Sequence, residues 1–477
     1  TVIFGVTAAA FFAAWLYALY HYVWTASRQF DSAWAIIFLI CLPPLFALFA
    51  LGAARLRPSP RVSAAVLWSS TVVSLYALEI PLAFWPLLLG NAGDVSPNER
   101  RQLAARFGVT FDARAAVEVL GDMQARGVDA VPAVSPAVLL EEQAGGFLKS
   151  AIRSDGTEVL PLAGVSNKAT VLCNETGAYV VYPSDEHGFH NPRGLWRSGR
   201  IDVAVVGDSF VHGFCVPSQQ NFVALIRSRY PATMSLGIGG NGPLLELATV
   251  KEFLPSLKPK IVLWAYFEKN DWNELRTEAR SPLLLHYLKP GFRQDLISRQ
   301  NDIDQALLAY IEEQSPQALL RLRKSRESDA FADLAEIAKL SNLRSTLGLV
   351  ASPPASEAQR TDADDAADRA LFRAVLQQAK RTVESWGGSL YFVYLPPWER
   401  YAAPSSAKKN RDEVLQTIAA LNIPIIDLHV AFQSHDDPLS LFPFRHSGHY
   451  NFAGNQLVAA AILERLVADG VLSPRPG

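Results

Sequence analysis

A serine stands directly after a strand-like apolar run in the stretch VAVVGDSFVHG, residues 203 to 213. Ser209 follows Gly207 and Asp208, and Gly213 closes the turn. A hydroxyl held at the end of a strand is what nucleophilic catalysis requires. The stretch is equally compatible with an ordinary strand-to-helix turn, in which Asp208 or Ser209 only caps the next helix.

Three more polar groups follow other strand-like runs. Gly240 lies in SLGIGGNGP, Asn270 in FEKND, and His449 in FPFRHSGHYNFAGN. A histidine base can take the serine proton, while the backbone N–H groups of Ser209 and Gly240 and the Asn270 amide can hold an oxyanion. The order of these groups along the chain predicts acyl transfer through Ser209.

Alternating strands and helices would position these groups. Near-continuous apolar strands separated by helices predict a parallel sheet that is covered on both faces. Ligands bind at the carboxyl ends of strands in such sheets, and Ser209 follows one of these ends. The strands are predicted at residues 201–206, 233–238, 260–267, 389–396 and 423–428.

From about residue 177 to 470 the sequence resembles the SGNH (GDSL-type) hydrolases, named for Ser, Gly, Asn and His in four separate blocks. GDSFVHG is similar to the nucleophile block, GIGGNGP to the glycine block and KND to the asparagine block, and His449 matches the base. SDEHGFHNP resembles a segment that precedes the nucleophile strand in membrane-attached bacterial members. The resemblance implies a three-layer αβα domain with Ser209 and His449 catalytic and with Ser209, Gly240 and Asn270 in the oxyanion hole.

The sequence departs from the family pattern at two positions. Glu268 replaces the glycine of the usual GxND block, and His446 stands where the family has the aspartate that orients the base. Three interpretations stay open: a Ser–His dyad helped by a backbone carbonyl, an acid supplied from elsewhere such as Asp436 or Asp437, or an inactive descendant. Loss of such an acid costs on the order of 10⁴ in kcat and leaves measurable catalysis.

Two histidine pairs, His446 with His449 and His187 with His190, have a spacing that could bind a metal on a helix. Both pairs lie in predicted loops, so we expect no metal, and no motif indicates a cofactor. Cys41 lies in an apolar segment, which leaves Cys173 and Cys215 for a disulfide. Their spacing alone does not decide whether they pair.

The composition predicts a membrane anchor. The 477 residues are 49% hydrophobic and only 19% charged, and the apolar excess lies at the front of the chain. We expect three transmembrane helices, followed by an interfacial segment up to about residue 90. The charge-free runs that predict them are residues 1–27, 33–54 and 62–78.

The loops between these runs predict the orientation. The second loop carries Arg55, Arg57 and Arg61, whereas the first has one arginine and one aspartate. The positive-inside rule therefore places the second loop in the cytoplasm and everything after about residue 95 outside it. A formal net charge of −2 and the lack of a recognisable motif give no reason to expect nucleic acid as a partner.

The predicted organisation has three parts: a three-helix anchor at 1–90, a helical neck at 91–157, and the α/β domain at 158–477 with a helical insertion at about 272–388. The predicted protein is an extracytoplasmic serine esterase or O-acyltransferase of the bacterial cytoplasmic membrane. We expect its substrate to be an acylated cell-envelope glycan or a lipid-linked molecule. The resemblance also implies a membrane-embedded partner that donates the acyl group. The alternative is a catalytically inactive SGNH-like subunit with a structural role in a larger membrane complex.

Overall fold

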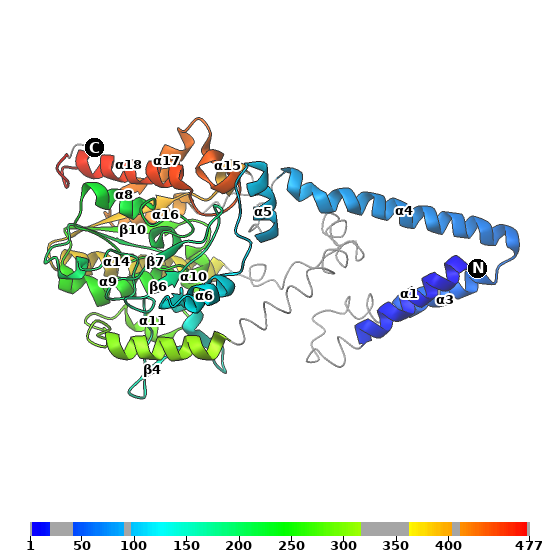
Figure 1. Cartoon of the computed structure of the whole chain (residues 1–477), viewed down its shortest axis with the longest axis horizontal. Helices are drawn as coiled ribbons and strands as arrows, with labels where there is room; N and C mark the ends of the chain where they lie inside the picture. The colour runs from blue at the N-terminus through cyan, green and yellow to red at the C-terminus, as the bar shows by residue number, and fades with distance from the viewer. Residues whose placement is uncertain (1, 20–41, 90–96, 316–361, 403–410, 475–477) are drawn as a thin grey trace. The chain divides into compact units, whose positions relative to one another are not determined.

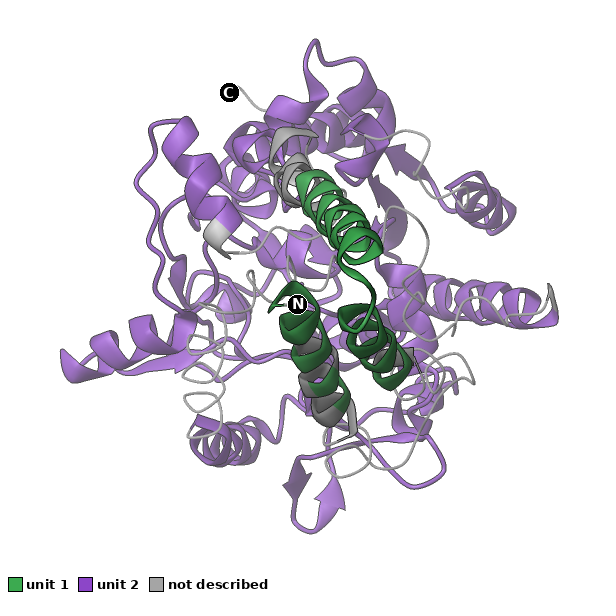
Figure 2. Cartoon of the chain, turned by 90° about the vertical axis from the view of Figure 1, so that its right-hand side faces the viewer, with its two compact units in different colours: residues 1–89, 328–354 green, residues 90–327, 355–477 purple. Residues whose placement is uncertain are grey.

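The structure is a computed structural model that describes residues 2–19, 42–89, 97–315, 362–402 and 411–474 (Figure 1). The chain divides into two compact units (Figure 2). The first unit comprises residues 1–89 and 328–354, and the second comprises residues 90–327 and 355–477.

The first unit contains the apolar helices α1 (Val2–Leu19), α3 (Leu42–Ala54) and α4 (Pro58–Leu89). The small residues Ala8, Ala47 and Ala50 pack α1 against α3. Within the described ranges, one helical segment, Pro58–Leu78 in α4, is long and apolar enough to cross a membrane. The first two predicted spans extend into residues 20–41, outside the described residues, so a three-helix anchor stays a prediction.

Helix α4 differs from its prediction in length. It runs to Leu89 without a break, where the sequence predicted a separate interfacial segment after residue 78. Its 32 residues rise about 48 Å at 1.5 Å each, more than the roughly 30 Å of a bilayer core. A single helix can therefore hold both a span and the segment beyond it.

The second unit is built on a sheet of five parallel strands, which confirms the predicted α/β class. The strand order is β12-β11-β10-β8-β9. Every pairing between neighbours in this sheet is parallel, with Val203 opposite Ile261 and Ile261 opposite Ser389. The strands are β8 (Val203–Val206), β9 (Thr233–Ser235), β10 (Ile261–Phe267), β11 (Ser389–Leu395) and β12 (Ile425–Asp427).

Helices cover both faces of this sheet, giving three layers (Figure 1). Alternate strand residues face opposite layers, so Val206 packs with one apolar cluster and Val205 with the other. On one face lie α9 (Pro243–Leu257), α14 (Asp362–Glu384) and α16 (Arg411–Ala420). On the other lie α8 (Phe222–Arg229), α17 (Leu428–Gln433) and α18 (Phe452–Ala468).

The predicted neck belongs to the same compact unit as the sheet. It begins with α5 (Pro97–Arg106) and α6 (Ala116–Ala125), and β1 (Ala130–Pro132) then pairs with β6 (Ala169–Val171). Strand β6 also pairs antiparallel with β7 (Val181–Pro183). Val131, Val134 and Leu139 are buried in the main core, which joins this region to the α/β unit.

Short elements complete the unit. The 3₁₀ turn η3 (Pro136–Leu139) is followed by two hairpins. The first pairs β2 (Leu140–Glu142) with β3 (Leu148–Ser150), and the second pairs β4 (Arg153–Ser154) with β5 (Thr157–Glu158). The described part of the predicted insertion contains helices and a non-helical stretch before residue 300. Its helical parts are α10 (Asp271–Glu278), α11 (Pro282–His286), residues 300–315 and α14.

Candidate active site

Ser209 is the first residue of the short helix α7 (Ser209–His212), which follows β8 at its carboxyl end. The Asp208 carboxylate caps this helix, because its Oδ1 accepts the Phe210 N–H at 2.9 Å. Gly213 ends the helix with φ of +82°, and a Cβ there would lie 2.8 Å from the Asn221 Nδ2. Only glycine fits this turn, and the turn leaves Ser209 at the strand end, 8% exposed.

His449 faces Ser209 from the segment that precedes α18. Its Nε2 lies 2.8 Å from the Ser209 Oγ, so the serine hydroxyl can donate to the imidazole. Asn451 caps α18 by accepting the Gly454 N–H at 3.1 Å, which fixes the chain just after His449. The structure thus brings together the two residues that the sequence singled out as nucleophile and base.

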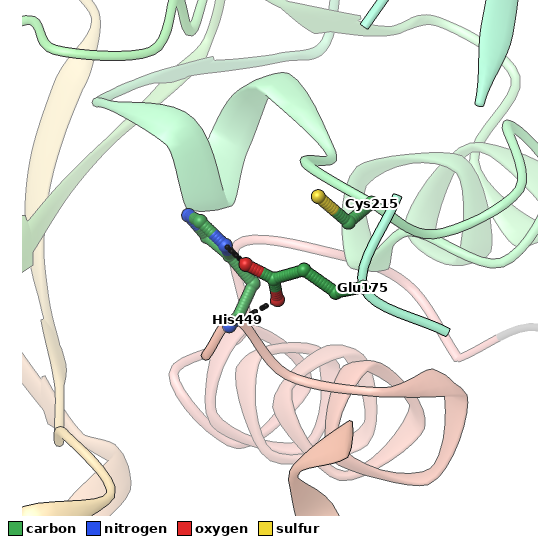
Figure 3. Close-up of side chains that lie close together, drawn as sticks. All are labelled: Glu175, Cys215 and His449. Carbon is green, nitrogen blue, oxygen red and sulfur yellow. Dashed lines mark hydrogen bonds and ion pairs between the residues drawn. The ribbon is translucent and has the colours of Figure 1, made fainter. Parts of the chain in front are cut away.

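Glu175 occupies the position of the orienting acid. Its Oε1 lies 3.1 Å from the His449 Nδ1, and its Oε2 accepts the His449 backbone N–H at 2.8 Å. Figure 3 shows the Glu175 carboxylate facing the imidazole, with Cys215 beside them. The Nδ1 proton is therefore held by Glu175, which leaves Nε2 to accept the Ser209 proton.

The surroundings keep Glu175 ionised. Burial by itself would raise its pKa, but the His449 imidazole and the Arg100 guanidinium, 3.3 Å away, lower the pKa of Glu175 to about 2. Arg100 comes from α5 and also donates to the Ser447 carbonyl at 3.4 Å. A negative carboxylate is what stabilises the imidazolium that forms when the base takes a proton.

No sequence motif points to Glu175. The acids predicted from the sequence, Asp436 and Asp437, do not take this place, because Asp437 pairs with Arg445 and Asp436 is exposed. Of the three open interpretations, the geometry matches an acid from elsewhere in the chain, with Glu175 in that place. The sequence feature that could have pointed to Glu175 is its position two residues after Cys173. A predicted disulfide between Cys173 and Cys215 would have placed Glu175 near Ser209.

The predicted oxyanion donors lie at the expected strand ends. Gly240 has φ of +79°, and its N–H donates to no other residue in the described ranges. The Asn270 Nδ2 lies 2.8 Å from the Glu274 Oε1 and 3.4 Å from the Asp208 Oδ2. Its Oδ1 is buried without a partner among the described residues. The role of Ser209, Gly240 and Asn270 in holding an oxyanion stays a prediction.

Glu268, which replaces the family glycine beside Asn270, forms a buried ion pair with Arg400. The Arg400 side chain also donates to the Tyr394 hydroxyl at 3.3 Å. A glycine at position 268 would leave this guanidinium without its carboxylate. This departure from the family pattern is therefore structural.

A second group of acids interacts with Asp208, the residue that precedes the nucleophile. Burial raises the pKa of Glu274 to about 9 and raises the pKa values of Glu246 and Asp271 well above the usual range. Neighbouring carboxyl groups add to each shift, that of Asp208 among them. Both Glu246 carboxyl oxygens lack a hydrogen-bond partner within the described part of the chain. These shifts favour the protonated form of each carboxyl, the reverse of the shift at Glu175.

Cys173 and Cys215 form a disulfide, with their Cα atoms 5.1 Å apart. One ligand atom each of Glu175, Cys215 and His449 lies within 4.8 Å of the others, a spacing that could hold a metal ion. The Cys215 sulfur is bonded to Cys173, and the His449 Nδ1 contacts Glu175. In the disulfide-bonded protein this group does not fit a metal ion, because it offers no thiolate.

The histidine pairs considered as metal ligands serve other contacts. The His187 Nδ1 lies 2.9 Å from the Gln300 Oε1, and the His190 Nε2 lies 2.8 Å from the Ser218 Oγ. His446 stacks on Trp398, while its neighbour in the motif, His449, contacts Ser209. Neither pair converges on a common point through these contacts.

Comparisons with known proteins found similar structures but no similar sequences of known function. No protein-family model matches the sequence, and no curated protein does. Similar solved structures include a two-domain esterase active on acetylated mannans, with a TM-score of 0.31 and 10% identity over 59% of this chain and 53% of that one. This chain thus spans about half of that esterase.

Two further similar structures are TesA and a lipase/acylhydrolase from Enterococcus faecalis. TesA has a TM-score of 0.30 and 11% identity over 57% of this chain and 99% of its own. The acylhydrolase has a TM-score of 0.31 and 14% identity over 58% of this chain and 100% of its own. These values are too low to transfer a function, which has to come from Ser209, His449 and Glu175.

Proposed function

We propose that this protein is an extracytoplasmic, membrane-anchored serine esterase or O-acyltransferase. The single observation that carries the proposal is the chain of contacts from Ser209 Oγ to His449 Nε2 at 2.8 Å and from His449 Nδ1 to Glu175 at 3.1 Å. A nucleophile, a base within hydrogen-bond reach and a group that orients the base are the parts that acyl transfer requires.

The proposed reaction has two half-reactions. The Ser209 Oγ attacks the ester carbonyl while its proton passes to the His449 Nε2, and the oxyanion faces the backbone N–H groups of Ser209 and Gly240. The ester C–O bond then breaks, and the leaving alcohol takes the proton from His449. Water or a sugar hydroxyl next attacks the acyl-serine and gives its proton to His449. The bond between the acyl carbon and the Ser209 Oγ then breaks, and His449 returns the proton to the Ser209 Oγ as the acid or the new ester leaves.

The proposed substrate is an acylated glycan of the cell envelope or a lipid-linked molecule. The apolar helix α4 and the charge pattern of the first 62 residues favour an enzyme held at the outer surface of the cytoplasmic membrane. Such tethering favours substrates that are themselves fixed at the membrane or in the wall. A membrane-embedded protein that supplies the acyl group is part of the acyltransferase form of this proposal.

The alternative, an inactive structural subunit, was motivated by the missing family aspartate. Glu175 makes the contacts to His449 that such an acid would make, and it is held ionised by its surroundings. This contact removes the main reason to favour an inactive descendant.

The test is ester turnover by the full chain, purified in detergent without reductant. We expect it to hydrolyse a p-nitrophenyl acetate probe and to lose this activity as Ser209→Ala and as His449→Ala. The matched control is Ser218→Ala, because Ser218 also contacts a histidine, His190, at 2.8 Å. Turnover that survives Ser209→Ala, or none in a correctly folded wild type, would contradict the proposal.

The same protein separates hydrolysis from transfer. With an acetylated donor and an unacetylated envelope glycan, transfer predicts an acetylated glycan in excess of free acetate. Free acetate alone, with every acceptor offered, would leave the esterase and exclude the acyltransferase form.

A further inference from the structure

The carboxylate that positions His449 does not come from the sheet that carries the nucleophile. Ser209 follows β8, but Glu175 lies on the connection between β6 and β7, which belong to a separate sheet of three strands. Two parts of the chain must therefore be held in register for Glu175 to reach His449. A small displacement matters, since about 1 Å of misplacement can cost on the order of 10²-fold in rate.

One covalent bond joins these two parts. The Cys173–Cys215 disulfide ties a residue two positions before Glu175 to a residue six positions after Ser209. Beside it, the Thr176 hydroxyl donates to the Cys215 carbonyl at 3.3 Å. Glu175 is thus flanked on both sides by contacts to the segment that follows the nucleophile helix.

The backbone at Cys215 is strained. Cys215 has φ of +58°, in the left-handed region that non-glycine residues seldom adopt. Such a conformation persists when its surroundings fix it, and it occurs often at functional sites. Here the disulfide and the Thr176 contact are the interactions that fix it to the Glu175 segment.

Non-covalent contacts also reach the nucleophile segment from the strands beside the turn, because Phe214 packs on Leu172 and Val180 and the Tyr182 hydroxyl lies 2.7 Å from the His212 Nε2. The hydrogen bonds of the turn residues Asn174 and Gly177 lead elsewhere. The Asn174 Oδ1 accepts the Gly177 N–H at 2.8 Å, which shapes the turn itself. The Asn174 Nδ2 donates to the Asp112 carbonyl at 3.0 Å, and the Asp112 N–H donates to the Gly177 carbonyl at 2.8 Å. These bonds hold the turn to residue 112, on the α5–α6 side, and not to the nucleophile segment.

We propose that the Cys173–Cys215 disulfide is a positioning element of the active site, which sets Glu175 against His449 and makes full activity depend on the oxidised protein. The proposal rests on the serine acyl-transfer function proposed above. Reduction removes the covalent link between the Glu175 segment and the nucleophile segment and leaves Ser209 and His449 in place, with the Thr176 hydrogen bond and the packing of Phe214 still joining the two segments. In the reduced protein the Glu175 carboxylate is then held less closely in position against His449.

The experiment compares oxidised and reduced full-length protein in detergent, in a Cys41→Ser background that prevents thiol exchange. Dithiothreitol reduces the bond, thiol counting verifies the reduction, and circular dichroism verifies the fold. EDTA is present throughout, because reduction would release a thiol beside Glu175 and His449 that could then capture a metal ion. The kcat and KM for p-nitrophenyl acetate are measured in both states.

We expect reduction to lower kcat on the order of 10- to 100-fold while KM changes by less than about twofold. Glu175→Gln supplies the decisive comparison: if the disulfide acts through Glu175, reduction should not lower the activity of this variant further. Cys173→Ala with Cys215→Ala should reproduce the reduced wild type. Unchanged kcat on reduction, or an equal fold-loss in Glu175→Gln, would overturn the proposal.

A second readout does not depend on turnover. The hydrogen bond between His449 Nδ1–H and Glu175 should give a low-field proton resonance in the oxidised protein that His449→Ala and reduction both abolish. If the oxidised wild type shows this resonance but no Ser209-dependent turnover, the proposed function fails and the positioning role is judged by the resonance alone. A resonance that persists after reduction would overturn the positioning role whatever the turnover.

Discussion

Two groups of carboxylic acids lie near Ser209, and they differ in the charge of the side chains next to them. Glu175 is buried beside a guanidinium and an imidazole, and the pKa of Glu175 is lowered to about 2. Glu246 and Asp271 are buried and Glu274 is partly buried, and burial together with neighbouring carboxyl groups raises their pKa values. Nearby cations thus favour the anion of Glu175, whereas nearby carboxyl groups favour the protonated forms of the other three.

This difference shows that the surroundings of an acid, more than its distance from the nucleophile along the chain, decide its role. Asp208 is adjacent to Ser209 in sequence, yet its carboxyl caps α7 and its pKa is raised by burial. Glu175 is 34 positions away in sequence and lies against the base. Pairs of titratable groups pushed in opposite directions are typical of sites with divided roles.

The largest effect is expected for Glu175→Gln. The amide keeps the size of the side chain but removes the charge that stabilises the imidazolium and favours the wrong histidine tautomer. The kcat should fall on the order of 10³- to 10⁴-fold with little change in KM, as measured with an activated ester. A loss below tenfold would mean that Glu175 is not the orienting acid.

A smaller effect is expected for Arg100→Met, which removes the cation from the Glu175 carboxylate. Both side chains are nearly buried, 12% and 11% exposed, so the free energy of unfolding at pH 7 should fall by about 1.5–3 kcal/mol. Chemical denaturation with Glu99→Gln as a neighbouring control measures this difference. Equal stability of Arg100→Met and wild type would contradict an ion pair at this site.

The Glu175 carboxylate also predicts how the free energy of unfolding changes with pH. The pKa of Glu175 is about 2 in the folded protein and 4.5 as the ordinary value, so its stabilising contribution is complete above about pH 4.5. It is lost as pH falls from about 4.5 to about 2. Wild type should therefore lose more stability than Glu175→Gln over this range, as thermal melts at each pH would show, and parallel curves would contradict it.

Glu274→Gln tests the opposite group. The pKa of Glu274 is raised from 4.5 to about 9, so unfolding releases a proton and wild-type stability falls as pH rises between these values. Glutamine keeps an acceptor for Asn270 and does not titrate. Relative to wild type, the melting temperature of this variant should rise by more than about 4 °C between pH 5 and pH 9, and a constant difference would contradict a protonated Glu274.

The smallest effect is expected for Asp436→Asn and Asp437→Asn. Asp436 is exposed, and the Asp437–Arg445 pair is partly exposed, at 40% and 47%, so solvent screens it. The kcat of each variant should stay within about twofold of wild type. A large loss in either would return the orienting role to the acids that the sequence suggested.

The sequence predicted the sheet well because its strands are continuous apolar runs with one helix between most of them. The sequence also predicted where Ser209 and His449 lie, because Ser209 follows the apolar run of β8 and His449 precedes helix α18, and both elements have clear sequence patterns. It missed Glu175 because the acid comes from a turn in a small sheet of three-residue strands, too short to show a period. Long-range contacts bring that turn to the site, the Cys173–Cys215 disulfide and the Arg100 ion pair among them, and spacing alone could not predict them.

The neck illustrates the same limit. Sequence analysis separated residues 91–157 as a helical linker because α5 and α6 have clear local signals. The structure places this region in the same unit as the sheet, and Arg100 of this region pairs with the Glu175 carboxylate. Short strands such as β1, with three residues, carry too little pattern to reveal such packing in advance.

The most direct measurement is the rate at which a fluorophosphonate labels Ser209 in the oxidised full-length protein, because it needs no knowledge of the natural substrate. We expect rapid labelling of wild type at Ser209 and no labelling of His449→Ala. The labelling rate of Glu175→Gln should be lower on the order of 10³-fold, and Glu175→Asp should recover part of the wild-type rate. Equal labelling rates in wild type and Glu175→Gln would contradict the claim that Glu175 completes the site.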